Sequence, residues 1–111
     1  MSNKIKVIVK RPDEVVGHMT YVGNTLKNLQ RTVDGYIETV TLAESPHRII
    51  MICNDEGKLR GLPASFVCGT VSQDLIVGTV IICGAEGDEF ADIPISMETW
   101  KTMLRAWGNV V

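Results

Sequence analysis

The amino-acid sequence predicts one α+β domain, in which a mainly antiparallel sheet of four to five strands carries two helices packed on one face. Three observations indicate this fold class. Several strand-like segments follow one another directly, which favours antiparallel pairing over a doubly wound parallel sheet. Two segments have apolar residues at helical spacing. The 111 residues, 45% of them hydrophobic, suit a single domain over residues 1–111.

The first strand is predicted over residues 4–10, where lysine and aliphatic side chains alternate. One face of this strand, with Ile5, Val7 and Val9, is expected to point into the core. The lysines, including Lys10, are expected to form its solvated face. Proline has no N–H to donate to a ladder, so the strand is expected to end at the proline that follows.

A short second strand is expected around residues 18–22, and a helix follows it. Asn24 or Thr25 is expected to cap that helix, because the side chains of these residue types accept hydrogen bonds from free N–H groups. Gly35 is free to take the left-handed conformation that ends many helices. Three apolar residues share one face of this helix: Leu26, Leu29 and Val33.

The middle of the chain indicates strands separated by turns. A strand is predicted over residues 36–42, although neither of its faces is wholly apolar. The apolar run in residues 48–53 predicts a central strand buried on both faces. Residues 54–57 are strong turn formers, and residues 58–62 are expected to return as a hairpin strand. Residues 63–72 are expected to form a loop.

The last third of the chain predicts one long strand and one helix. Residues 74–83 alternate as a strand does, and Gly78 within them indicates a bulge or a close backbone approach. Residues 84–92 are acidic and are expected to form a solvated turn region. Ser96 is expected to cap the final helix. Four residues form the apolar stripe of that helix: Trp100, Met103, Leu104 and Trp107.

Charge and hydropathy disfavour two classes of partner. The formal net charge is -2 and the pI is about 5.6, whereas proteins that bind nucleic acid usually present a basic face. No apolar run approaches the roughly 20 residues of a membrane-spanning helix. The N-terminal residues 1–4 lack the apolar segment of a signal peptide. We therefore expect a cytoplasmic protein, with neither nucleic acid nor membrane as its partner.

No residue pattern predicts a metal site, a cofactor or a catalytic centre. The three cysteines, Cys53, Cys68 and Cys83, lack the paired spacing of zinc ligands and are expected to be reduced core residues. His18 and His47 have no cysteine or histidine at ligand spacing. A Cys–His catalytic pair stays open, because such partners meet in space and not in sequence. A non-enzymatic role is nevertheless favoured.

Two segments are candidate binding sites. The first includes the turn formers after the central strand and two cations: Asn54, Asp55, Glu56, Gly57, Lys58 and Arg60. Its cations and free N–H groups could hold an anion, or the segment could be a turn whose residues serve only the backbone. The second consists of Trp100 and Trp107. Tryptophan is frequent in interface hot spots, so these side chains predict either a partner interface, including a homodimer, or core packing.

Four motifs occur in order along the chain and resemble those of a known family. They are Leu26-x-x-Leu29-Gln30, Val33-Asp34-Gly35-Tyr36-Ile37-Glu38, Asn54-Asp55-Glu56-Gly57-Lys58-Leu59-x-Gly61-Leu62-Pro63 and Asp74-x-Ile76-x-Gly78-Thr79-Val80-x-Ile82. The family consists of small domains of unknown function from bacteria, bacteriophages and integrated mobile elements. The resemblance covers roughly residues 4–104. It implies a compact α+β fold and a phage or mobile-element setting, and it supplies no catalytic residues.

The sequence therefore favours a non-enzymatic accessory or interaction protein of a phage or mobile element, which binds a host or viral macromolecule. A protein partner is expected, and the sequence does not identify it. Two alternatives stay open. One is a protein that binds a small anion or nucleotide through residues 54–63. The other is an enzyme whose site is assembled from residues scattered in the sequence.

Overall fold

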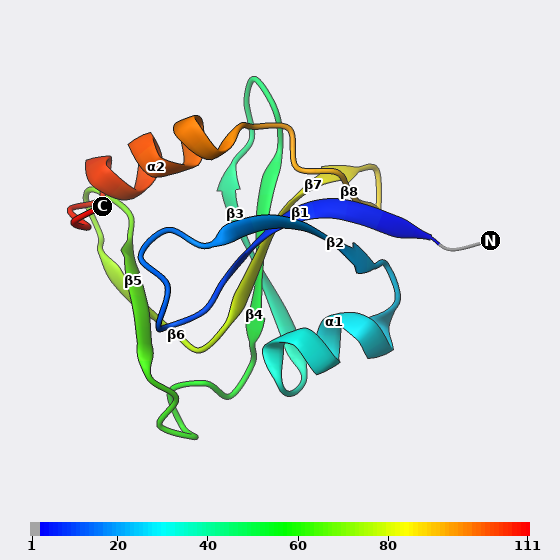
Figure 1. Ribbon diagram of the computed structural model, residues 1–111, viewed down its shortest axis with the longest axis horizontal. Coiled ribbons are helices and arrows are strands. Elements are labelled where there is room, and N and C mark those ends of the chain that lie inside the picture. The colour runs from blue at the N-terminus through cyan, green and yellow to red at the C-terminus, as the bar shows by residue number, and fades with distance from the viewer. Residues whose placement is uncertain (1–2) are drawn as a thin grey trace.

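The computed structural model describes residues 3–111, which form a six-stranded sheet, a two-stranded sheet and two helices (Figure 1). The elements in chain order are β1 (Lys4–Lys10), β2 (His18–Gly23), α1 (Leu26–Val33), β3 (Ile37–Ala43), β4 (Ile49–Asn54), β5 (Ala64–Cys68), β6 (Asp74–Val77), β7 (Val80–Glu86), β8 (Glu89–Ala91) and α2 (Met97–Ala106). The predicted α+β class and antiparallel pairing are confirmed, but the strands number eight, not four or five.

The large sheet has the order β2-β1-β7-β4-β3, and β8 pairs with the end of β7. The small sheet consists of β5 and β6. All six residues of β4 are buried, as predicted for a central strand. No helix within residues 3–111 is both long and apolar enough to cross a membrane. The expectation about a signal peptide concerns in part Met1 and Ser2, which lie outside the described residues.

The two helices lie on opposite faces of the large sheet, so the prediction that they share one face is wrong (Figure 1). Strand β1 shows the reason. Its residues Val7 and Val9 belong to the core cluster of α1, together with Leu29. Ile8 lies between them and belongs to the core cluster of α2, together with Trp100. Because adjacent strand residues point to opposite faces, both faces of the sheet are apolar and each needs a cover.

Gly78 divides the long strand predicted over residues 74–83 into β6 and β7, which belong to different sheets. Its φ is 76°, a conformation that favours glycine. Its N–H donates a hydrogen bond to the carbonyl of Pro63 at 2.8 Å. This contact lies where a bulge or a close backbone approach was predicted, and the side chain of Leu62 fills the space that a Cβ at Gly78 would need. Beyond β7, residues 89–91 pair back as β8, where a solvated turn was predicted.

Residues 58–61 form turns and residue 62 belongs to no strand, so the predicted hairpin strand at this position is wrong. The N–H of Arg60 donates to the carbonyl of Glu56 at 2.9 Å, and the N–H of Leu62 donates to the carbonyl of Gly57 at 3.0 Å. These short-range bonds use the backbone groups that a strand would need for pairing. Strand β5 begins two residues later, in place of the predicted loop.

Both predicted helix caps are observed, and the end of α1 differs from the prediction. Thr25 and Ser96 accept hydrogen bonds from N–H groups three residues further on, at 3.2 Å in each case. At the other end of α1, the left-handed conformation occurs at Asp34, with φ 62°, and not at Gly35 as predicted. Aspartate tolerates this conformation better than most residues. The N–H of Gly35 still bonds back to the carbonyl of Gln30 at 3.0 Å.

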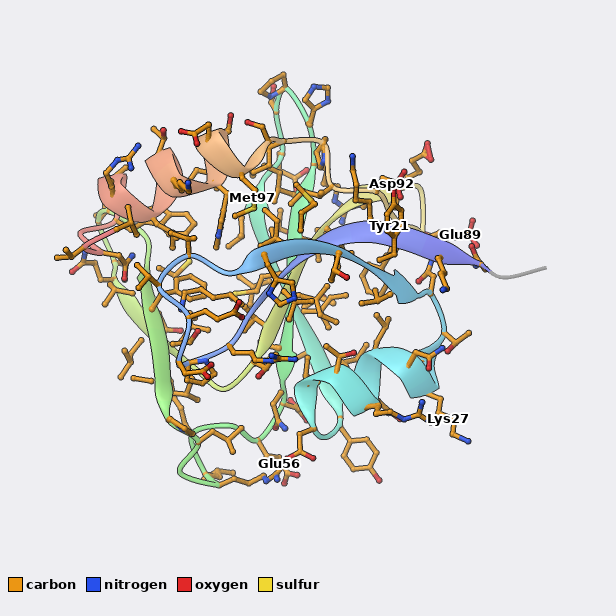
Figure 2. The ribbon with its side chains drawn as sticks, viewed as in Figure 1. Tyr21, Lys27, Glu56, Glu89, Asp92 and Met97 are labelled. Carbon is orange, nitrogen blue, oxygen red and sulfur yellow. The ribbon has the colours of Figure 1, made fainter. Side chains whose placement is uncertain are left out.

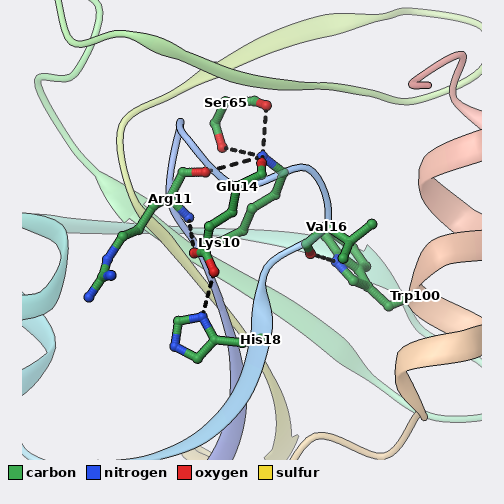
Figure 3. Close-up of polar contacts among 7 residues, drawn as sticks. All are labelled: Lys10, Arg11, Glu14, Val16, His18, Ser65 and Trp100. Atoms are coloured by element: carbon green, nitrogen blue, oxygen red, sulfur yellow. Dashed lines mark hydrogen bonds and ion pairs between the residues drawn. The ribbon is translucent and has the colours of Figure 1, made fainter. Parts of the chain in front are cut away.

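Lys10 is buried, with 1% of its surface exposed, so its predicted place on a solvated face is wrong. Figure 3 shows its ammonium group surrounded by oxygen atoms. Nζ donates to the carbonyls of Glu14 at 2.8 Å, Ser65 at 2.9 Å and Arg11 at 3.3 Å. Ser65 Oγ lies 3.2 Å away. The lysine therefore joins the connection between β1 and β2 to strand β5.

Glu14 holds the same connection through its carboxylate (Figure 3). Oε1 accepts the N–H of Arg11 at 3.0 Å, and Oε2 lies 2.7 Å from Nδ1 of His18. Partial burial raises the pKa of Glu14, but the Arg11 N–H and His18 outweigh it and leave the pKa below the ordinary 4.5. A carboxylate with a lowered pKa stabilises the folded state above its unfolded pKa, and this contribution is lost as the pH falls through the folded pKa.

We therefore expect Glu14→Gln to lower the free energy of unfolding at neutral pH, and to lose less stability than the wild type on acidification. Urea denaturation at pH values of about 7, 5 and 3 measures both effects. Glu86→Gln, at the exposed end of β7, is the matched control and should follow the wild type. A Glu14→Gln variant whose acid dependence equals that of the wild type would contradict this prediction.

Candidate functional site

Strand β3 is a free edge of the large sheet. It pairs with β4 on one side, and within residues 3–111 no strand pairs with its other side. Four consecutive residues of β3 are exposed: Glu38, Thr39, Val40 and Thr41. At the opposite edge, only two of the six residues of β2 are exposed. An edge strand presents unpaired N–H and C=O groups, so β3 offers backbone hydrogen bonds to solvent or to a partner.

A groove of about 160 Å³ lies on the sheet face beside this edge. The register of β3 and β4 sets its floor, because Glu38 lies opposite Cys53 and Val40 lies opposite Met51. Directly opposed residues of an antiparallel pair share one face of the sheet. Strand β6 and the loop after β4 form the walls.

Exposed apolar side chains line this groove. Leu59 of the loop is 88% exposed, Leu75 of β6 is 48% exposed and Val40 of β3 is 39% exposed. These residues come from three separate segments, and the fold brings them to one place. Large apolar side chains that gather in a groove and stay accessible to solvent are typical of binding surfaces.

The groove is also acidic. Four carboxylates and one ammonium group line it: Glu38, Asp55, Glu56, Asp74 and Lys58. Nζ of Lys58 lies 2.6 Å from Oδ1 of Asp74, so this pair is internally neutral. The other three carboxylates leave the groove with a net negative charge of three. Figure 2 shows Glu56 at the end of the molecule that lies away from Met97 of α2.

The thiol of Cys53 lies at the floor of the groove, and the charges around it change its pKa. Burial raises its pKa, and the charges of Glu38, Asp55 and Asp74 raise the pKa further, to about 11. A thiol with this pKa is protonated at neutral pH and is a poor nucleophile. Burial also raises the pKa of Cys83, to about 12. The same carboxylates that disfavour the thiolate disfavour any other anion in the groove.

The predicted anion site lies at this groove, but the fold separates its two cations. Lys58 pairs with Asp74 at the groove. Arg60 points to the end of α1, where Nη2 lies 3.2 Å from Oδ2 of Asp34 and Nη1 donates to the Asp34 carbonyl. The two cations therefore bind different partners and do not converge on one position.

Asn54 and Gly57, also predicted as site residues, shape the loop from inside. Asn54 is buried, and its Nδ2 donates to the carbonyls of Val33 at 3.1 Å and Asp34 at 3.0 Å. Its Oδ1 accepts the N–H of Glu56 at 2.8 Å. The amide therefore satisfies carbonyls at the C-terminus of α1 and fixes the start of the loop. Gly57 is also buried.

Trp100 and Trp107, predicted as an interface or as core, form an aromatic cluster with Phe66. Trp100 has no exposed surface. Its ring centroid lies 5.7 Å from that of Phe66 and 5.8 Å from that of Trp107, edge to face in both cases. Trp107 is half-buried and stacks on Phe66 at 6.2 Å. Trp100 is thus core and offers no surface to a partner in this fold.

A wider cleft, of about 540 Å³, borders β8. The charged residues that line it are of both signs: Arg48, Glu86, Glu89 and Asp92. Asp92 already accepts the N–H of Lys6 at 2.8 Å. Within residues 3–111, no group of three or more histidine, cysteine or acidic side chains could hold a metal ion. The groove beside β3 is therefore the better candidate for a site.

The fold and the groove define the class of protein: a small α+β domain with a free sheet edge beside an acidic and apolar groove. Residues 5–105 match a domain of unknown function, DUF3846, and the chain belongs to this family. The resemblance seen in the sequence motifs is therefore confirmed at the level of a domain-of-unknown-function family. No curated protein and no solved structure matches the chain.

Proposed function

We propose that this protein is a non-enzymatic interaction domain, which binds a basic segment of a partner protein in the groove beside β3. One observation supports the proposal: three exposed apolar side chains and three uncompensated carboxylates line a single groove at a free sheet edge. A lysine or arginine side chain has an aliphatic stem that can lie on apolar groups while its charged end reaches carboxylates.

The proposed setting is a phage or mobile element, with a host or viral protein as the partner and the cytoplasm as the location. This setting rests on the sequence resemblance. The proposed role needs no catalytic group, and the raised pKa values of Cys53 and Cys83 weigh against an enzyme that uses either thiol.

The charge distribution weighs against the alternative of an anion- or nucleotide-binding protein. Lys58 and Arg60 are each paired with a carboxylate. An anion in the groove would face a net charge of the same sign, which is unfavourable at short distance. A basic group in the same place would neutralise charges that repel one another. The groove therefore favours a cation.

Peptide binding tests this proposal. A short labelled peptide of repeated Lys-Thr-Val-Thr, which places lysine and valine on the same face of an extended strand, is expected to bind the protein. The same peptide with glutamate in place of lysine is not expected to bind. Binding should weaken as salt is added, because exposed charges are screened. Fluorescence anisotropy titrations at two salt concentrations measure both effects.

A charge reversal localises the binding. Glu56→Lys is expected to weaken binding of the basic peptide by about three- to tenfold, because it reverses one exposed charge at the groove. The matched control is Glu86→Lys, the same change on an exposed residue outside the groove, which should bind as the wild type does. Equal affinity for the two peptides, or equal weakening by the two variants, would overturn the proposal.

A further inference from the structure

We infer that the partner segment binds as an added β-strand along β3, with a basic residue opposite Glu38 and an apolar residue opposite Val40. This inference rests on the proposed function, because it assumes that a basic segment occupies the groove. It adds the backbone geometry of the complex and the residue pattern of the partner.

The pairing of β3 sets the length of the docking edge. Residues 37–41 pair with β4 in unbroken register, from Ile37 opposite Asn54 to Thr41 opposite Ile50. The register shifts between Thr41 and Ala43, which marks an irregularity at this end of the strand. Such irregularities locally disrupt strand pairing. The regular edge is therefore five residues long, or about 17 Å at the usual rise of an antiparallel strand.

The free edge of β3 has little of the usual protection against strand addition. Exposed edges of soluble proteins commonly carry charged residues, especially lysine, or proline or a bulge. The sequence of β3, IETVTLA, has no lysine or proline, its one charged residue is Glu38, and its register shift lies beyond Thr41. Threonine and valine occupy its central positions, and both residue types favour extended backbone. The edge is thus able to accept a partner strand.

The alternation of β3 sets which partner side chains meet the groove. Glu38 and Val40 line the groove, whereas Thr39 and Thr41 point to the other face of the sheet. An added strand would place alternate side chains over the groove, where cross-strand pairs of opposite charge and of apolar groups are favourable. The expected partner pattern is therefore lysine or arginine, any residue, then an aliphatic residue, or the same pattern reversed for the opposite strand direction.

Charge complementarity selects a basic partner over a second copy of this chain. Two copies joined through β3 would bring two acidic grooves close together, each with a net negative charge of three. The whole chain also has a formal net charge of -2. A basic strand neutralises this charge, whereas a second copy doubles it.

Backbone methylation of the peptide tests the added strand. N-methyl groups on alternate residues block one edge of an extended peptide and leave the other edge free. We expect one methylation pattern to lower the affinity of the lysine–valine peptide at least tenfold, and the complementary pattern to leave it within about twofold. If the unmethylated peptide does not bind, the proposed function fails. If it binds and neither pattern matters, only the added strand is overturned.

A charge exchange tests the register. Glu38→Lys is expected to weaken binding of the lysine–valine peptide. A peptide in which one lysine is changed to glutamate should restore binding to this variant. Loss without rescue at any lysine position would contradict the pairing with Glu38. Sedimentation of the free protein supplies the last test. A dimer that Val40→Lys dissociates would place a second copy on β3 and overturn the inference, whereas a monomer agrees with it.

Discussion

Trp100→Ala is expected to lower the free energy of unfolding by about 3–5 kcal/mol, the usual loss for removing a buried tryptophan. The indole has no exposed surface and packs against the rings of Phe66 and Trp107. Its Nε1 donates a hydrogen bond to the carbonyl of Val16 at 2.8 Å, which Figure 3 shows. The alanine variant therefore loses packing and also leaves a carbonyl without its donor.

Chemical denaturation followed by far-ultraviolet circular dichroism measures this loss without depending on tryptophan fluorescence. Trp107→Ala, at the C-terminal end of the same helix, is the matched control, and its half-buried ring should contribute less. Trp100→Phe keeps an aromatic ring and removes the N–H, so it should lie between the wild type and Trp100→Ala. Equal losses for Trp100→Ala and Trp107→Ala would contradict the placement of Trp100 in the core.

The aromatic cluster also supports the groove. Strands β5 and β6 form a two-stranded sheet, which is marginally stable alone. Phe66 of β5 fixes this sheet to α2 through the two tryptophans. Asn109 adds a second link, since its side chain bonds the N–H and the carbonyl of Val67 at 2.9 and 2.8 Å. Because β6 is a wall of the groove, the C-terminal helix indirectly maintains the candidate site.

Local patterns predicted the elements well where the signal was short-range: an alternation, an unbroken apolar run or a cap residue. The alternation in residues 4–10, the apolar run in residues 48–53 and the cap at Ser96 all correspond to observed elements. The layer arrangement was not predictable in this way. Ile8 interrupts the alternation of β1, because it lies between the aliphatic residues Val7 and Val9, and it packs on the face opposite these neighbours. Periodicity alone does not say which helix covers which face.

The candidate site was predictable only in part, because long-range pairing assembles it. Residues 54–58 were chosen for their turn and charge chemistry, and they do line the groove. Glu38 and Val40 were missed as site residues, since only the register with β4 places them there. The partner of Lys58 is Asp74, 16 residues away. One signal was present: a strand with no wholly apolar face, as in residues 36–42, is typical of an exposed edge.

Lys10→Met is expected to lower the free energy of unfolding by about 3 kcal/mol, because three partly buried carbonyls lose their common donor. Methionine keeps most of the aliphatic stem, so the variant isolates the ammonium group from the packing. The hydrogen bonds to Glu14 and Ser65 are the shortest of the set, at 2.8 and 2.9 Å. Denaturation in urea measures the loss, and Lys4→Met, an exposed residue of the same strand, should change little.

The pH dependence of the free energy of unfolding gives a second, independent test of the role of Lys10. Burial lowers its pKa below the ordinary 10.5, although the charges of Glu14 and Asp13 act in the opposite direction. Between the lowered pKa and 10.5 the unfolded chain binds more protons than the folded chain, so the stability that this group contributes rises with pH. The wild type should therefore gain stability relative to Lys10→Met as the pH increases towards about 10. If the difference in stability between the wild type and Lys10→Met shrinks over this range, folding raises the pKa of Lys10, which would contradict this prediction.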